Sequence, residues 1–124
     1  MERLKDTMPA NLPSFLKRFG LLVSYYRLLK GISEVEFIDS THLNLYNIEN
    51  GFSNLTLESI WKIAEFLEIS PQTILTQAWD HSGSLSTSEL INRIRNLKEK
   101  IKIERKKHNK HSSTALQATS RKQH

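Results

Sequence analysis

The stretch of residues 38–51 holds the side chains of this chain best suited to contacting another molecule. Leu45 and Ile48 lie three residues apart and can share the buried face of a helix. The other positions carry groups that form hydrogen bonds, stack or make apolar contacts: Thr41, His42, Leu43, Asn44, Tyr46 and Asn47. The pattern predicts a helix over 41–50 with a narrow buried side and an outer side available for contact. A plain connecting helix with a solvated outer side is the alternative.

The ends of this helix and of the one before it are indicated by capping residues. Ser40 or Thr41 can accept hydrogen bonds from the backbone N–H groups of a first helical turn. Gly51 can adopt the left-handed conformation that ends a helix. Upstream, residues 33–36 have the Ser-x-x-Glu spacing of a capping box, which opens a helix. Because the next cap follows so soon, we predict that this earlier helix has one turn at most and ends near residues 38–39.

The rest of the chain supplies the elements that hold these two helices. Apolar residues at a 3.6-residue period predict a helix over 14–30, and Gly31 ends it. Thr56 caps another helix, and Ser-Pro at 70–71 is a strong start signal for the next. A second capping box opens a long helix over 86–107. No segment shows the alternating pattern of a strand, so the sequence predicts an all-α protein.

The predicted organisation is a five-helix domain with extensions on both sides. Its parts are a flexible N-terminal arm (1–13), the helical domain (14–80), a linker (81–85), the long helix (86–107) and a disordered basic tail (108–124). The tail is assigned from its polar, basic composition without periodicity.

Composition limits the class of protein. The chain has 124 residues, no cysteine and a formal net charge of +5. The absence of cysteine excludes disulfides and thiolate chemistry, and we expect a cytoplasmic location. The longest apolar run near the N-terminus, residues 21–23, is far too short for a membrane span. Residues 105–124 contain six basic and no acidic side chains, whereas residues 1–104 contain twelve basic and thirteen acidic ones. The positive charge therefore belongs to the C-terminal end.

Several short motifs occur in a definite order between residues 19 and 75. They are Phe19-Gly20, Tyr26-Arg27, Gly31-Ile32-Ser33, Ile48-Glu49-Asn50-Gly51, Asn54-Leu55-Thr56-Leu57-Glu58, Ile63-Ala64 and Leu67-Glu68-Ile69-Ser70-Pro71. In this order and spacing the chain resembles the helix-turn-helix domain of the phage Cro and repressor type. That family consists of five-helix, DNA-binding domains found mostly in bacteria and phages. The resemblance covers residues 15–76 and implies a sequence-specific, DNA-binding transcriptional regulator.

The resemblance also implies roles for individual residues. The helix over 41–50 would lie in the major groove of double-stranded DNA with its outer side chains toward the bases. Asn47 could form two hydrogen bonds with adenine, and Leu43 could contact a thymine methyl group. Asn50 matches a phosphate-contacting position. Arg27 and Glu49 match the positions of a buried ion pair that ties the first helix to the end of the third.

The charge distribution departs from that of a typical DNA-binding domain. None of the predicted contact positions is Lys or Arg, and residues 16–76 contain five basic and seven acidic side chains. Between Gly31 and Gly51 the chain is also shorter than the family's pattern. Attraction to phosphates would then come from the basic C-terminal stretch between Arg105 and Lys122, including Lys106 and Lys107. The alternative is a degenerate helix-turn-helix that acts as a protein-interaction or assembly module without specific DNA binding.

The long helix carries a short apolar seam. Its members follow a 4-3-4 spacing that is typical of a heptad repeat, over about two repeats: Leu90, Ile94, Leu97 and Ile101. Two interpretations are open, a homodimer through the seam or a sixth helix packed on the domain. A homodimer would suit DNA reading, because two recognition helices must reach half-sites about one DNA turn apart.

No pattern indicates an enzyme, a cofactor or a metal site. Asp80-His81 precedes a serine-rich loop that lacks the glycine elbow of a catalytic serine. His108 and His111 have metal-ligand spacing but no further ligand nearby. Trp61 and Trp79 fall on apolar helix faces, so we expect them in the core.

Overall fold

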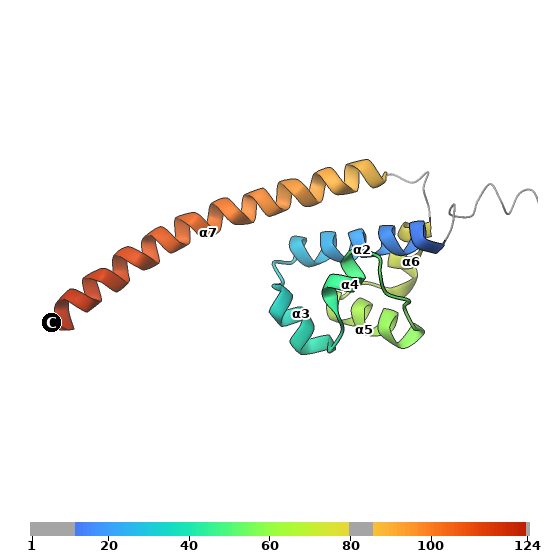
Figure 1. Ribbon diagram of the computed structural model, residues 1–124, viewed down its shortest axis with the longest axis horizontal. Helices are drawn as coiled ribbons and strands as arrows, with labels where there is room; N and C mark the ends of the chain where they lie inside the picture. The colour runs from blue at the N-terminus through green and yellow to red at the C-terminus, as the bar shows by residue number, and fades with distance from the viewer. Residues whose placement is uncertain (1–11, 80–85, 124) are drawn as a thin grey trace, which may run out of the picture. The chain divides into compact units, whose positions relative to one another are not determined.

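The computed structural model describes the backbone of residues 12–79 and 86–123 and the side chains of residues 12–79 and 86–107. Regular structure in these residues is helical throughout, which confirms the predicted all-α class. The helices are α2 (Leu12–Leu29), α3 (Glu34–Thr41), α4 (Leu45–Glu49), α5 (Leu57–Leu67), α6 (Pro71–Trp79) and α7 (Thr87–Gln123) (Figure 1). The described residues up to Ile94 form one compact unit, and those from Arg95 onward form a second.

Two predicted connecting segments lie mostly outside the described residues. Residues 1–11 of the predicted arm and the predicted linker 81–85 are not described. The last two residues of that arm, Leu12 and Pro13, belong to α2. Proline is favoured at the first positions of a helix, where its missing N–H would have no partner in any case.

Most of the predicted helix starts are confirmed by their capping hydrogen bonds. In three helices the hydroxyl oxygen of the capping residue accepts a bond from the backbone N–H three residues later, at 3.1–3.2 Å: Ser33, Thr56 and Ser86. The helix predicted from Ser70-Pro71 begins at Pro71. Gly31 follows α2 with a φ of +68°, the left-handed conformation expected of a glycine that ends a helix.

The predicted end of α3 is wrong. We expected one turn ending near residues 38–39, whereas α3 has eight residues and ends at Thr41. Phe37 and Thr41, one turn apart, are both buried, so the inward face of α3 continues for a second turn. The hydroxyl of Thr41 donates to the Phe37 carbonyl at 2.7 Å and therefore does not cap the next helix.

The shortened helix of the pair is α4 rather than α3. We predicted a helix over 41–50, but α4 comprises only Leu45–Glu49. Its N-cap is Asn44, whose side-chain oxygen accepts from the Asn47 N–H at 3.1 Å. His42 ends α3 in the left-handed conformation (φ 59°), with its N–H donating to the Ile38 carbonyl at 2.8 Å.

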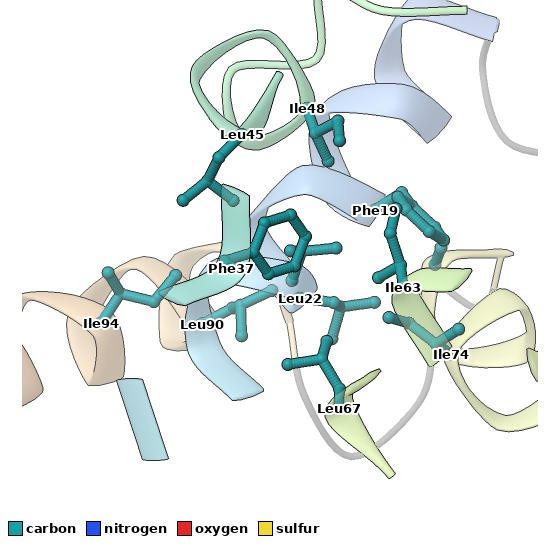
Figure 2. Packing of buried hydrophobic residues seen from close by; sticks show 12 residues of the cluster. Phe19, Leu22, Phe37, Leu45, Ile48, Ile63, Leu67, Ile74, Leu90 and Ile94 are labelled. Atoms are coloured by element: carbon teal, nitrogen blue, oxygen red, sulfur yellow. The ribbon is translucent and has the colours of Figure 1, made fainter. Parts of the chain in front are cut away.

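The core of the domain draws on all of its helices. α2 packs against α4, α5 and α6, and α3 packs against α4 and α5. Figure 2 shows the buried apolar side chains of these helices meeting around Phe37, with Leu90 and Ile94 of α7 in the same cluster. The positions of Leu45 and Ile48 confirm that α4 buries a narrow apolar side. α4 is thus anchored by two apolar side chains, whereas Tyr46 is exposed and Asn47 is half-buried.

The seam of α7 divides between the core and the surface. Leu90 and Ile94 are buried, with 0% and 6% exposure, whereas Leu97 and Ile101 are half-buried. The buried guanidinium of Arg18 also donates to the Thr87 hydroxyl at 3.0 Å, which fastens the first turn of α7 to the domain. Of the two interpretations of the seam, packing on the domain describes its first half. Leu90 and Ile94 are not available to a second copy in this conformation.

The prediction that both tryptophans lie in the core is wrong. Trp61 is 63% exposed and Trp79 is 41% exposed. Trp79 contacts Phe15 edge to face, with ring centroids 6.3 Å apart. On α5 the buried positions are Ile63, Ala64 and Leu67, and Trp61 lies beside this stripe rather than on it. An apolar residue next to an apolar stripe is therefore not evidence of burial.

The last helix is longer than predicted. We expected α7 to end near residue 107 and residues 108–124 to be disordered, whereas the backbone is helical to Gln123. The physical reason is the absence of any glycine or proline after Gly83, so no residue interrupts the helix.

No helix among the described residues is both long enough and apolar enough to cross a membrane.

Candidate nucleic-acid interface

The candidate interface is built from α3, α4 and the turn between them. Three residues, His42 to Asn44, join the end of α3 to the start of α4. A turn of three to four residues between two helices is what a helix-turn-helix requires. Because α3 packs against both α4 and α5, the pair is supported by the core rather than standing alone.

A buried ion pair fastens α4 to α2, as the resemblance implied. Nε of Arg27 lies 3.1 Å from one carboxylate oxygen of Glu49, and Nη2 lies 3.4 Å from the other. Nη1 of Arg27 donates to the Ile32 carbonyl at 2.9 Å. The two side chains are only 6% and 16% exposed. The pair uses the one charge on α4, so the outer side of that helix is left uncharged.

Gly20 allows α4 to approach α2 closely. A Cβ atom added at Gly20 would lie 2.8 Å from the Glu49 carbonyl oxygen and closer still to that of Ile48. Both neighbours are backbone atoms, which cannot swing aside as a flexible side chain could. The last turn of α4 therefore lies directly against α2 at Gly20 and is linked to the same helix by the Arg27–Glu49 pair.

The structure removes one predicted contact residue, Thr41, from the interface and packs part of a second, Leu43, against the core. Thr41 is 3% exposed and belongs to α3, where its hydroxyl is bonded within the helix. Leu43 is half-buried in the turn and packs against the core. Its predicted contact with a thymine methyl group stays a prediction for the exposed part of this side chain, whereas the burial of Thr41 excludes a contact there. The error arose because Ser40, Thr41 and Asn44 can all cap a helix, and the sequence does not show which one does.

Five of the predicted residues remain at the surface. His42, Asn44, Tyr46 and Asn50 are exposed, and Asn47 is half-buried. Two of their amides have local partners: Asn44 caps α4 through its oxygen, and the Asn50 amide nitrogen donates to the Tyr46 carbonyl at 2.8 Å. The side chain of Asn47 makes no hydrogen bond within the described part of the chain.

One surface residue was missed by the sequence reasoning. Phe52 follows Gly51, between the helix predicted over 41–50 and the one capped by Thr56, and its ring is 69% exposed. It contacts Tyr46, which is equally exposed, with ring centroids 6.2 Å apart. A phenylalanine between glycine and serine, outside any apolar period, was the available signal. The two rings form an exposed aromatic pair beside Asn47 and Asn50.

The residues of α3, α4 and the turn between them include no lysine or arginine. No lysine or arginine occurs between Lys30 and Lys62, whereas Glu34, Glu36 and Asp39 of α3 are all exposed. These carboxylates would repel DNA phosphates. The lack of positive charge noted in the sequence of the domain is therefore also found at α3 and α4.

The predicted phosphate-binding residues lie on the long helix α7. Arg105, Lys106 and Lys107 are exposed side chains of α7. They belong to the second compact unit, which starts at Arg95. Because α7 is a regular helix, its repeat fixes the direction in which each of these three side chains points relative to the other cations of α7.

Comparisons of the chain with protein-family models, with curated proteins and with solved structures gave no match.

Proposed function

We propose that the protein is a sequence-specific regulator that binds double-stranded DNA through α4 and the turn before it. The observation that carries this proposal is the α3–turn–α4 pair, anchored by the Arg27–Glu49 ion pair with an uncharged, amide-bearing side outward. Base edges in the major groove are read by such groups, and Asn47 suits adenine. His42, Asn44 and Tyr46 would flank it, and Asn50 would face a phosphate. Attraction to the phosphates comes from the cations of α7.

A change at Asn47 tests this role. We expect Asn47→Ala to reduce the preference for one base pair by about 1–3 kcal/mol while leaving binding to unrelated duplexes unchanged. The measurement is a selection of preferred sequences from random duplexes by the full chain, followed by titration of the selected duplex and its single-base variants. Gln72→Ala, which removes an exposed amide on α6, is the matched control. A selection that yields no preferred sequence would contradict the proposal.

A protein-interaction or assembly module is the second candidate function. It is favoured by large apolar side chains at the surface of an acidic domain: Tyr46, Phe52, Leu57 and Trp61, all at least 63% exposed. Tryptophan and tyrosine are enriched among residues that dominate protein interfaces. The same selection separates the candidates, because an interaction module would retain no duplex even at low salt. If a Trp61→Ser variant still binds the selected duplexes, Trp61 is not needed for DNA binding.

A further inference from the structure

The cations of the second compact unit are regularly spaced along one helix. Residues 95–107 contain seven cations and two acids, all exposed and all on the single helix α7. A helix turns by about 100° per residue, so residues three, four and seven apart share a side. Five of the cations follow this spacing, and we call them the cationic stripe: Arg95, Lys98, Lys102, Arg105 and Lys106. Lys100 and Lys107 fall on the opposite side of the helix.

We infer that the cationic stripe is a sequence-independent binding site for the phosphates of duplex DNA. This deepens the proposed function, on which it rests, because it names the part of α7 that supplies the phosphate contacts. It also changes the expected set of phosphate contacts. Lys107 points away from the stripe and leaves that set, whereas Arg95, Lys98 and Lys102 are added to it.

The charge density of the stripe suits a nucleic-acid strand. The eleven steps from Arg95 to Lys106 span about 16 Å of helix, or roughly one charge per 4 Å. One strand of duplex DNA has a phosphate about every 3.4 Å along its axis. No ion pair among the described residues involves a cation of the stripe, so none of these charges is neutralised by a described acid. Glu99 at one edge is the acid closest to the stripe.

The same helix is a poor match for a membrane surface. Interfacial helices insert a broad apolar side into the headgroup region. Residues 95–107 have only three apolar side chains, and Ile103 lies away from the side shared by Leu97 and Ile101. The ratio of cations to apolar side chains therefore favours a phosphate backbone over an anionic bilayer.

A matched pair of double variants of the full chain tests the inference. Lys98→Gln with Lys102→Gln removes two charges of the stripe, and Lys100→Gln with Lys107→Gln removes two from the opposite side. Both variants have the same net charge, and lysine and glutamine have similar helix propensities. Circular dichroism is expected to show equal helix content. The measurement is duplex affinity as a function of salt concentration, with a labelled duplex of random sequence.

We expect the stripe variant to lower the slope of log affinity against log salt by about 2, at roughly 0.9 per phosphate contact. At 0.1 M salt this corresponds to a loss of affinity on the order of tens-fold, whereas the control variant should stay within about twofold of the original. Equal losses in the two variants would overturn the inference in favour of diffuse charge. An unchanged slope in the stripe variant would overturn it and leave the proposed function standing.

Two further outcomes concern the ligand. If the unchanged protein binds no duplex at low salt, both the proposed function and this inference are wrong. If it binds phosphatidylserine vesicles in place of duplex, and the stripe variant loses that binding, the ligand is an anionic lipid surface and the inference is overturned.

Discussion

Replacing Glu49 with alanine is expected to lower the free energy of unfolding by about 3–5 kcal/mol, the usual cost of removing one partner of a buried ion pair. The Arg27 guanidinium is almost fully buried and would keep only its bond to the Ile32 carbonyl. Two of its donors would then face a site without an acceptor. Denaturant unfolding of the two proteins under identical conditions gives the difference directly.

An exposed ion pair in the same domain supplies the control. Lys62 and Glu58 lie 3.3 Å apart on α5 with exposed side chains, and Glu58→Ala is expected to cost less than about 1 kcal/mol. Glu49→Gln should fall between the two, because an amide oxygen can still accept from the guanidinium. If Glu49→Ala costs no more than Glu58→Ala, the pair contributes no more than a surface contact and α4 is held by its apolar anchor alone.

Leu90→Ala is expected to destabilise the domain by about 2–5 kcal/mol, as large-to-small changes in a packed core do. Leu90 is fully buried among core residues of the domain, and truncation would leave a cavity there. The loss should not depend on protein concentration, because the contacts lie within one chain. Thermal unfolding at several protein concentrations tests both statements.

The matched control is Ile101→Ala, at the other end of the same seam. Ile101 is half-buried in the second compact unit, so a much smaller loss is expected. A homodimer held by the whole seam would behave differently, since its melting temperature would rise with protein concentration. Leu90→Ala and Ile101→Ala would then weaken the dimer to a similar degree.

Local signals predicted the helix starts well where a second residue supported the cap. Ser33 and Ser86 each have a glutamate three residues later, Ser70 is followed by Pro71, and each of these patterns opens a helix. The Arg27–Glu49 pair came from the family resemblance, because two residues twenty-two positions apart carry no local sign of contact. Its geometry bears out that implication.

The boundary between α3 and α4 could not be predicted in the same way. Residues 39–44 include several cap-forming side chains in succession, and local preference does not choose among them. The choice depends on which residues reach the core, and Thr41 is drawn inward beside Phe37. The predicted contact of Thr41 failed for this reason. Trp61 shows the reverse error, because an apolar side chain was assigned to a core that α5 fills with other residues.

If the chain reads DNA as proposed, the five-residue length of α4 limits how many base pairs this helix can distinguish. Such a helix is about 7 Å long, and base pairs follow one another about every 3.4 Å, so it covers about two of them. For a DNA reader of the proposed kind, each mismatch costs about 1–3 kcal/mol against roughly 10⁶–10⁹ competing genomic sites. One copy would bind a group of short sequences rather than one unique genomic site. A unique site would require several copies side by side, or a partner that reads the adjoining bases.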